Sequence, residues 1–222
     1  MQYNGDKLQA RIQEQNIHNL AYADYKMDSA GLFEIPNMLP THISREDLED
    51  TPIQSFDYVL REKRPENIGV HFFMWDYKFE RIWNYPDRYT SFLKKFKFVL
   101  SPDFSVYYDT PNIVQLFNVY RNRWCGRYWQ DNGITVIPTF SLGNPDFFKT
   151  FCSGIPKHSV IATSTMGDGR WGNYKMLRAS WNMMLQYLEP ELILLYGRDI
   201  VDELGLDGNI VFKRQINTKV AI

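Results

Sequence analysis

Two aspartates stand where a metal ion or a proton-transfer site could form. Asp76 follows the apolar run at residues 69–75, and Asp103 follows the run at residues 96–100. If these runs are neighbouring parallel strands, their backbones lie about 4.8 Å apart and the two carboxylates can face one another. Facing carboxylates bind divalent metal ions and act as general acids and bases. Asp76 and Asp103 are therefore candidate catalytic residues, with a divalent metal of unknown identity as a candidate cofactor.

Each aspartate also has a structural explanation. Asp76 stands where a helix beginning at Tyr77 needs an N-cap, and a carboxylate there accepts free backbone N–H groups. Asp103 follows Pro102 and lies several residues before the next expected cap, Thr110, so capping does not explain it. A turn formed by Pro-Asp is the structural role left for Asp103. Both explanations stay open for each residue.

Residues 120–129 combine arginine with aromatic residues more densely than any other stretch. On a helix, Arg123 and Arg127 share one face at i, i+4, with Arg121 nearby. Guanidinium groups among aromatic rings can hold phosphates and stack on bases. The same composition describes arginines that pair with acids and lie on aromatic rings. The pattern makes Arg121 and Arg123 candidate phosphate-binding residues, with structural ion pairs as the alternative.

A turn rich in hydroxyl groups and glycine follows the apolar run at residues 159–163. The segment 167–172 spells G-x-G-x-x-G between an expected strand and an expected helix, which is the context of a dinucleotide site. The motif comes late in the chain, and the helix begins after the last glycine. A phosphate held at this helix N-terminus fits better than a dinucleotide. Ser164, Thr165 and Gly167 are therefore further candidate phosphate-binding residues.

The elements that must position these residues form an alternating pattern. Six short apolar runs rich in β-branched and aromatic residues follow Pro65, with helix-like segments between them. This alternation predicts an α/β fold with a mostly parallel sheet of about six strands and crossover helices, either an open sheet or a partial barrel. The strands are expected at residues 69–75, 96–100, 134–139, 159–163, 192–196 and 210–212, and the main helices at 77–95, 111–132 and 173–188.

Capping residues mark the expected helix ends. Ser44 occupies the N-cap position of a short helix near residues 44–48, and Thr110 that of the long helix. Gly133 ends the long helix in the left-handed conformation, and Pro190 stops the last one. One stripe of the long helix is expected to face the core: Ile113, Leu116, Phe117, Tyr120, Trp124 and Tyr128.

The positions of the prolines and the composition indicate the domain organisation. Residues 1–65 contain four prolines and are expected to form an N-terminal arm packed on the domain, and residues 66–222 a single α/β domain. The first residues lack the apolar region of a secretory signal. The densest apolar run, residues 192–196, is far shorter than the ~20 residues that span a bilayer. We expect no membrane contact and a cytoplasmic location.

Charge and cysteine content restrict the class of partner. The chain carries 25 Lys and Arg against 26 Asp and Glu, a formal net charge of −1, so a nucleic acid would have to meet a local basic patch. The two cysteines, Cys125 and Cys152, have no neighbouring Cys or His at ligand spacing, which disfavours a zinc site. Two reduced thiols are expected.

Several stretches, in this order, resemble one known family: residues 98–105, 119–124, 128–130, 137–139, 154–159, 164–167 and 190–197. The chain resembles the domains of unknown function numbered 4417, found in bacteria, phages and other mobile elements, over roughly residues 35–212. The resemblance implies no reaction. Its pattern includes Ser101, Asp103, Arg121, Arg123, Ser164, Thr165, Gly167 and Gly197. It does not include Gly169 and Gly172, which further disfavours a dinucleotide site.

Two hypotheses about function follow. In the first, the protein handles a nucleotide or a nucleic-acid phosphate, and in its enzymatic form it is a hydrolase with Asp103 and Asp76 as metal ligand or general base. In the second, it is a non-catalytic interaction module that acts on a host or phage protein, for example in counter-defence. The phage setting of the family implies either DNA metabolism or interference with host defence. Co-purified nucleotide or metal would favour the first hypothesis, and a stoichiometric protein partner the second.

Overall fold

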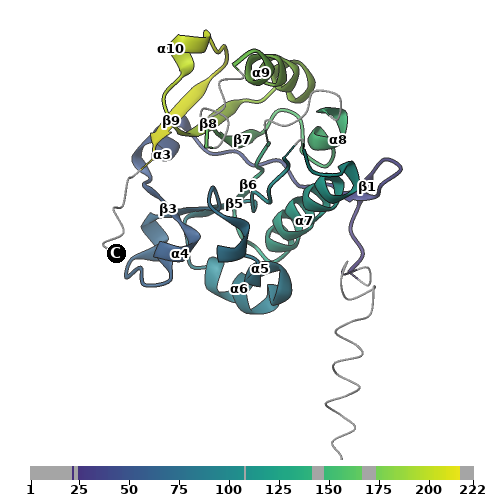
Figure 1. Ribbon diagram of the computed structural model, residues 1–222. Coiled ribbons are helices and arrows are strands. Elements are labelled where there is room, and N and C mark those ends of the chain that lie inside the picture. Colours follow the sequence, from purple (N-terminus) through teal and green to yellow (C-terminus); the bar gives the residue numbers. More distant parts are fainter. Residues whose placement is uncertain (1–21, 23–24, 108, 142–147, 167–173, 216–222) are drawn as a thin grey trace, which may run out of the picture.

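The computed structural model describes residues 22, 25–107, 109–141, 148–166 and 174–215 (Figure 1). Two parallel sheets form its centre. One contains β3 (Ile53–Ser55), β4 (Gly69–His71), β5 (Phe98–Leu100) and β6 (Val136–Ile137). The other contains β7 (Val160–Ser164), β8 (Leu192–Gly197) and β9 (Ile210–Arg214). Within each sheet the spatial order of the strands follows the chain.

The two sheets meet at β6 and β7. Thr139 and Ala162 form an isolated parallel bridge, and the N–H of Phe140 donates to the carbonyl of Ala162 at 2.8 Å. The strands curve strongly, because the rings of His71 on β4 and Tyr196 on β8 lie 4.2 Å apart with β5, β6 and β7 between those strands. Among the described residues β9 does not pair with β3, so the sheets stay open and no barrel closes.

Helices surround the strands, and Figure 1 looks into the ring that they form. They are α3 (Arg45–Asp50), α4 (Phe56–Val59), α5 (Arg81–Asn84), α6 (Pro86–Leu93), α7 (Asn112–Asp131), α8 (Phe148–Cys152), α9 (Tyr174–Leu188) and α10 (Val201–Leu204), with 3-10 turns η1 (Pro65–Asn67) and η2 (Asp76–Lys78). A hairpin of β1 (Ser29–Ala30) and β2 (Ile35–Pro36) packs its second strand on α7. None of the helices in the described part has the length and hydropathy needed to cross a bilayer.

Three apolar clusters hold these layers together. One lies between β4, β5 and helices α5 to α7 and contains Phe72 and Trp129; a second lies between β7, β8 and helices α8 and α9 and contains Trp181. The third fills the concave face of the sheets, where Leu100 from one sheet meets Leu194 from the other. Burying each such side chain contributes roughly 1.5–3 kcal/mol. The concave cluster makes the two sheets one unit.

The predicted α/β fold with a mostly parallel sheet is confirmed, in its open form. Each of the six expected runs overlaps one strand, β4 to β9, and β7, β8 and β9 extend one or two residues beyond their runs. The sheet has one strand more, since β3 pairs in parallel with β4. β3 lies within residues 1–65, the segment assigned from sequence to the arm. From the same segment, Tyr22 stacks on Trp124 with ring centroids 4.4 Å apart.

Most helix ends follow the expected signals. The Oγ of Ser44 accepts the N–H of Asp47 at 3.0 Å, Gly133 has a φ of 80°, and α9 ends at Leu188. The cap expected at Thr110 is wrong by one residue, because Pro111 is the N-cap of α7 and makes no side-chain bond. The expected helix at residues 77–95 is divided into η2, α5 and α6. α6 begins at Pro86, whose ring removes a donor and cannot continue α5.

The prediction that one apolar stripe of α7 faces the core is wrong for the first half of the helix. Ile113 is 70% exposed and Phe117 is also exposed, whereas Asn122 and Arg123 are buried. α7 contacts both β6 and α8, beside the junction of the two sheets, so a polar face of the helix points into protein. The hydrogen bonds described below compensate for the burial of these polar groups.

Both cysteines are free thiols, as expected. Cys125 and Cys152 are buried and form no disulfide. Burial raises the pKa of the Cys152 thiol to about 12 and raises that of Cys125 as well. Thiols that stay protonated at neutral pH are poor nucleophiles and poor metal ligands. The two cysteines are therefore core residues.

Candidate functional site

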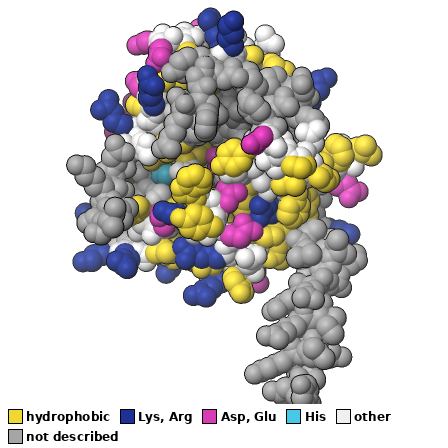
Figure 2. All heavy atoms as spheres, viewed as in Figure 1, with side chains coloured by type: hydrophobic (Ala, Val, Ile, Leu, Met, Phe, Trp, Pro, Cys, Tyr) yellow, Lys and Arg dark blue, Asp and Glu magenta, His cyan; other side chains and the backbone are white. Residues whose placement is uncertain are grey.

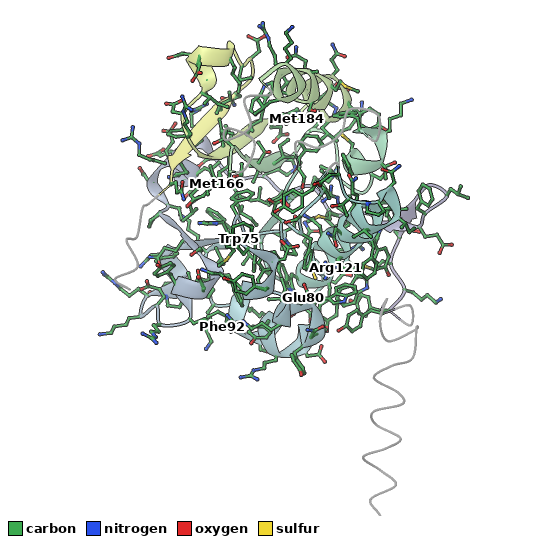
Figure 3. The ribbon with its side chains drawn as sticks, in the orientation of Figure 1. Trp75, Glu80, Phe92, Arg121, Met166 and Met184 are labelled. Carbon is green, nitrogen blue, oxygen red and sulfur yellow. The ribbon has the colours of Figure 1, made fainter. Side chains whose placement is uncertain are left out.

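The carboxyl ends of the parallel strands lead to one edge of the sheets. β4 leads to Trp75, β5 to Ser101, β7 to Met166 and β8 to Arg198. In Figure 3, Trp75 and Met166 lie inside the ring of helices, over the strand ends. Parallel α/β folds bind their ligands beyond the carboxyl ends of the strands. We take this carboxyl edge as the candidate site.

Asp76 joins two loops of the carboxyl edge. Its carboxylate accepts the backbone N–H of Ser105 at 3.1 Å and the hydroxyl of Ser105 at 2.8 Å. The N-cap role considered for Asp76 is wrong, because it is the first residue of η2 and Trp75 occupies the cap position. Asp76 instead holds the loop that follows β5 to the loop that follows β4.

Asp103 accepts a hydrogen bond from the hydroxyl of Ser141 at 2.9 Å. Asp76 and Asp103 follow neighbouring strands, as expected, but each carboxylate bonds to a different serine. Among the residues that the structure describes, no group of three or more His, Cys, Asp or Glu side chains is placed to hold a metal ion.

A buried polar network lies beneath Asp103. Ser101 donates to the Oδ1 of Asn122 at 2.8 Å, and the Nδ2 of Asn122 donates to Thr139 Oγ1 and to the carbonyl of Pro102, both at 2.7 Å. The network fixes the chain segments that follow β5 and β6. Asn122 and Thr139 were not candidates from sequence, because a polar residue gives no periodic signal of burial.

Arg123 belongs to the same network. Its Nε donates to the carbonyl of Ser153 at 3.0 Å, its Nη1 to the carbonyl of Thr139 at 3.0 Å, and its Nη2 to the carbonyl of Phe151 at 2.7 Å. Burial lowers the pKa of the guanidinium to about 10, and Cys152 and Asp103 oppose that shift. Arg123 is positively charged at neutral pH and all three of its nitrogens bond to protein.

Arg121 is also held by protein groups. Its Nη1 forms an ion pair with Glu80 at 2.6 Å, its Nη2 donates to Asn118 at 2.6 Å, and its guanidinium lies 3.9 Å from the centre of the Phe104 ring. Figure 3 labels Arg121 on α7 close to Glu80, which is the N-cap residue of α5. The structural alternative left open for the arginines describes the contacts of both Arg121 and Arg123.

The turn after β7 is locked to the turn after β8. Ser164 Oγ accepts the N–H of Met166 at 2.9 Å, and Thr165 Oγ1 accepts the N–H of Arg198 at 2.7 Å while donating to its carbonyl at 3.1 Å. Gly197, with a φ of 124°, allows this approach, because a Cβ there would lie 2.5 Å from Thr165 Oγ1. The guanidinium of Arg198 is mostly exposed beside this pair of turns. Gly167 and the rest of the glycine motif lie outside the described residues.

A cavity of about 10 Å³ opens beside Asn122 and Ser141. This volume holds about one water molecule.

His71 lies at the inner end of the site, at the end of β4. Its Nδ1 accepts the N–H of Phe73 at 3.2 Å, and its ring packs on Tyr196. Burial lowers the pKa of His71 to about 3, although Asp57 opposes the shift. His71 is therefore neutral at physiological pH and is a buried residue of the core.

Replacing His71 by asparagine should make the fold less sensitive to acid. The pKa of histidine in an unfolded chain is near 6.5. Between pH 6.5 and about 3, His71 is therefore protonated in the unfolded chain but neutral in the folded one. The stability contributed by neutral His71 is present above pH 6.5 and is lost as the pH falls toward 3. Urea denaturation at pH 6.5 and pH 5 should show the wild type losing about 2 kcal/mol more than H71N. Equal losses would contradict the buried neutral state.

The chain is similar to two mycobacteriophage proteins. It is 36% identical to the Gene 1 protein of Mycobacterium phage L5 over 174 residues, which cover 77% of this chain and 74% of that protein. It is also 36% identical to the Gene 1 protein of Mycobacterium phage D29 over 172 residues, 77% of this chain and 62% of that protein. This chain thus spans less than two thirds of the D29 protein. No solved structure matches it.

The family model described as "Domain of unknown function (DUF4417)" matches residues 26–211, which is most of the chain. This match and the phage relatives confirm the resemblance inferred from the motifs: the chain belongs to the DUF4417 family.

Proposed function

We propose that the carboxyl edge binds a nucleotide or a nucleic-acid phosphate. The observation that supports the proposal is the exposed guanidinium of Arg198 at the strand ends, in a turn whose backbone is bonded to the hydroxyl of Thr165. A guanidinium forms charge-assisted bonds to phosphate that are stronger than neutral hydrogen bonds. Ligands commonly bind at the carboxyl edge of parallel sheets, where the turns that follow the strands lie close together.

Arg198 can exchange partners. It pairs with Glu203 at 3.1 Å, and both side chains are exposed. An exposed ion pair contributes at most about 1 kcal/mol, so a phosphate can displace the carboxylate at little cost. Ser164 and Thr165 are buried and their hydroxyls bond to the backbone of Met166 and Arg198, so in this proposal they fix the turn that carries Arg198. Gly167 remains a candidate phosphate-binding residue from sequence. In this proposal Arg121 and Arg123 support the edge through their bonds to protein groups.

Asp103 gives the proposed site its acid–base group. It is partly exposed and its carboxylate is oriented by the hydroxyl of Ser141. In a hydrolytic form of the function, Asp103 accepts the proton of the water that attacks the phosphorus. Asp76 has a positioning role, because it fixes Ser105 in the neighbouring loop.

Two variants test binding and hydrolysis separately. Arg198→Gln is expected to weaken the binding of inorganic phosphate and of ATP by about 10-fold to 100-fold, because a hydrogen bond to a charged group contributes about 1.5–3 kcal/mol. Asp103→Asn is expected to leave binding within a few fold and to lower phosphate release from ATP by at least about 100-fold. Calorimetric titration measures the first effect, and a phosphate-release assay with magnesium measures the second.

Matched controls are available on the same chain. Arg45→Gln removes an exposed guanidinium on α3, and Asp109→Asn removes an exposed carboxylate. Both controls should behave as wild type. If R198Q binds phosphate and ATP as well as R45Q does, or if the wild type binds neither ligand, the proposed binding site is wrong. Binding without any hydrolysis would remove the hydrolytic form alone.

A second candidate function rests on a different surface. Ile113, Val114 and Phe117 form an exposed apolar strip on the first half of α7. Apolar side chains grouped on one exposed helix are typical of protein-binding surfaces. A non-catalytic interaction module acting on a host or phage protein would use this strip. A stoichiometric complex that is lost in Phe117→Glu and kept in R198Q would favour this second function.

A further inference from the structure

Trp75 is exposed in a way that the fold does not explain. It is 63% exposed, whereas the other tryptophans in the described part of the chain, Trp83, Trp124, Trp129 and Trp181, are all buried. A large ring left in water gives up the stabilisation that its burial would provide. Figure 3 places Trp75 inside the ring of helices, on the face where the strands end. An exposed tryptophan at this place is available to a ligand.

Two tyrosines accompany Trp75 on the same edge. Tyr77, in η2, is 75% exposed, and Tyr107, in the loop after β5, is 55% exposed. The two loops are tied together at Ser105, whose Oγ is bonded to Asp76 at 2.8 Å and lies 3.3 Å from the Tyr107 hydroxyl. Three exposed rings therefore stand on two loops that share one hydrogen-bonded connection.

The charges around this cluster are largely balanced. Asp57 pairs with Lys78 at 2.9 Å, and Glu80 pairs with Arg121 at 2.6 Å. The carboxylate of Asp76 is occupied by two hydrogen bonds from Ser105. Two acidic residues near the cluster, Asp57 and Glu80, are thus paired with cations, which weakens their repulsion of a polyanion, whereas Asp76 keeps its negative charge. Figure 2 shows hydrophobic, acidic and basic side chains interspersed on this face.

We propose that Trp75, Tyr77 and Tyr107 form a stacking platform for the bases of a single-stranded nucleic acid. This inference rests on the proposed function, in which Arg198 binds phosphate at the same edge. Aromatic rings on fixed loops, together with a cation for the backbone, are the two parts of sequence-tolerant single-strand binding. A duplex hides the faces of its bases, so the platform selects unpaired strands. The presence of three exposed rings on these loops, where a mononucleotide has one base to stack, is the observation that favours a strand of several bases.

Fluorescence anisotropy with a labelled 12-nucleotide oligo(dT) tests the platform. Trp75→Ala is expected to raise the Kd by about 5-fold to 150-fold, because base–aromatic stacking contributes about 1–3 kcal/mol per base. Trp75→Phe should keep most of the affinity, since a ring remains. Tyr77→Ala and Tyr107→Ala should each weaken binding in the same direction. Tyr187→Ala, which removes an exposed ring on α9, is the matched control and should bind as wild type.

The dependence on salt separates stacking from phosphate binding. W75A should keep the wild-type slope of log Kd against log salt, whereas R198Q should reduce it by about 0.7 for each phosphate that the protein no longer neutralises. If W75A and Y187A bind the oligonucleotide equally, or if a duplex of the same length binds as tightly, the platform is wrong. The proposed function is not contradicted by those results if phosphate and ATP still bind and the Arg198→Gln variant binds them more weakly. Binding of none of the three ligands would overturn both proposals.

Discussion

Replacing Arg123 by methionine is expected to lower the free energy of unfolding by about 3–5 kcal/mol. Methionine fills much of the same volume but donates no hydrogen bond. The carbonyls of Thr139, Phe151 and Ser153 would lose their donor in a buried environment. Asp103 would also lose the stabilising positive charge of the guanidinium. Each of these losses carries a desolvation cost, and together they loosen α8 and the end of β6 from α7.

Urea denaturation of R123M and of Arg198→Met measures this effect against a matched control. Arg198 is exposed and its ion pair with Glu203 contributes at most about 1 kcal/mol. R123M should therefore lose several times more stability than R198M. If R123M kept wild-type stability and lost phosphate binding, the guanidinium would be a ligand group and its assignment as a supporting residue would be wrong.

The strands could be predicted from sequence because they are buried on both faces. β8 is a nearly continuous run of apolar residues and β7 begins with Val160, Ile161 and Ala162, and every residue of both strands is buried. β3 was missed for the opposite reason. It follows Pro52, has only three residues, and Ile53 is its single apolar side chain. Its place in the sheet depends on pairing with β4, which local sequence does not encode.

The buried face of α7 could not be predicted from the spacing of apolar residues. Periodicity assumes that a helix buries its apolar side and exposes its polar side. α7 violates this assumption, because Asn122 and Arg123 are buried and bond to α8 and to the segments that follow β5 and β6. Such partners are distant in sequence. Only the folded chain shows that the polar face is satisfied.

The location of the candidate site was predictable, but the partners of its residues were not. Taking the residue after each strand placed Asp76, Asp103 and Ser164 at one edge without any knowledge of contacts. The bond from Asp76 to Ser105 joins residues 29 positions apart. The sequence therefore could not distinguish an N-cap role for Asp76 from a role in holding two loops together. Trp75 was missed as a site residue because it ends an apolar run, where the pattern indicates burial.

Gly154→Ala is the second change with a large expected effect, about 2–5 kcal/mol of unfolding free energy. Gly154 has a φ of 74°, and a Cβ there would lie 2.2 Å from the carbonyl oxygen of Pro36, a backbone atom that cannot rotate away. The carbonyl of Gly154 also accepts the N–H of Met38 at 2.9 Å. A backbone shift that relieved the clash would disturb this bond. The loss should appear as a lower midpoint in urea denaturation.

Gly31→Ala is the control that isolates the steric contact. Gly31 also has a positive φ, 67°, but a Cβ there would meet nothing within 4 Å. G31A should therefore show only the conformational cost of a left-handed residue, about 1–2 kcal/mol. The difference between the two variants measures how tightly the segment after β2 is held against the turn at Gly154. If both variants lost the same stability, that contact would add nothing, and the segment would be held on the domain by its packing on α7 alone.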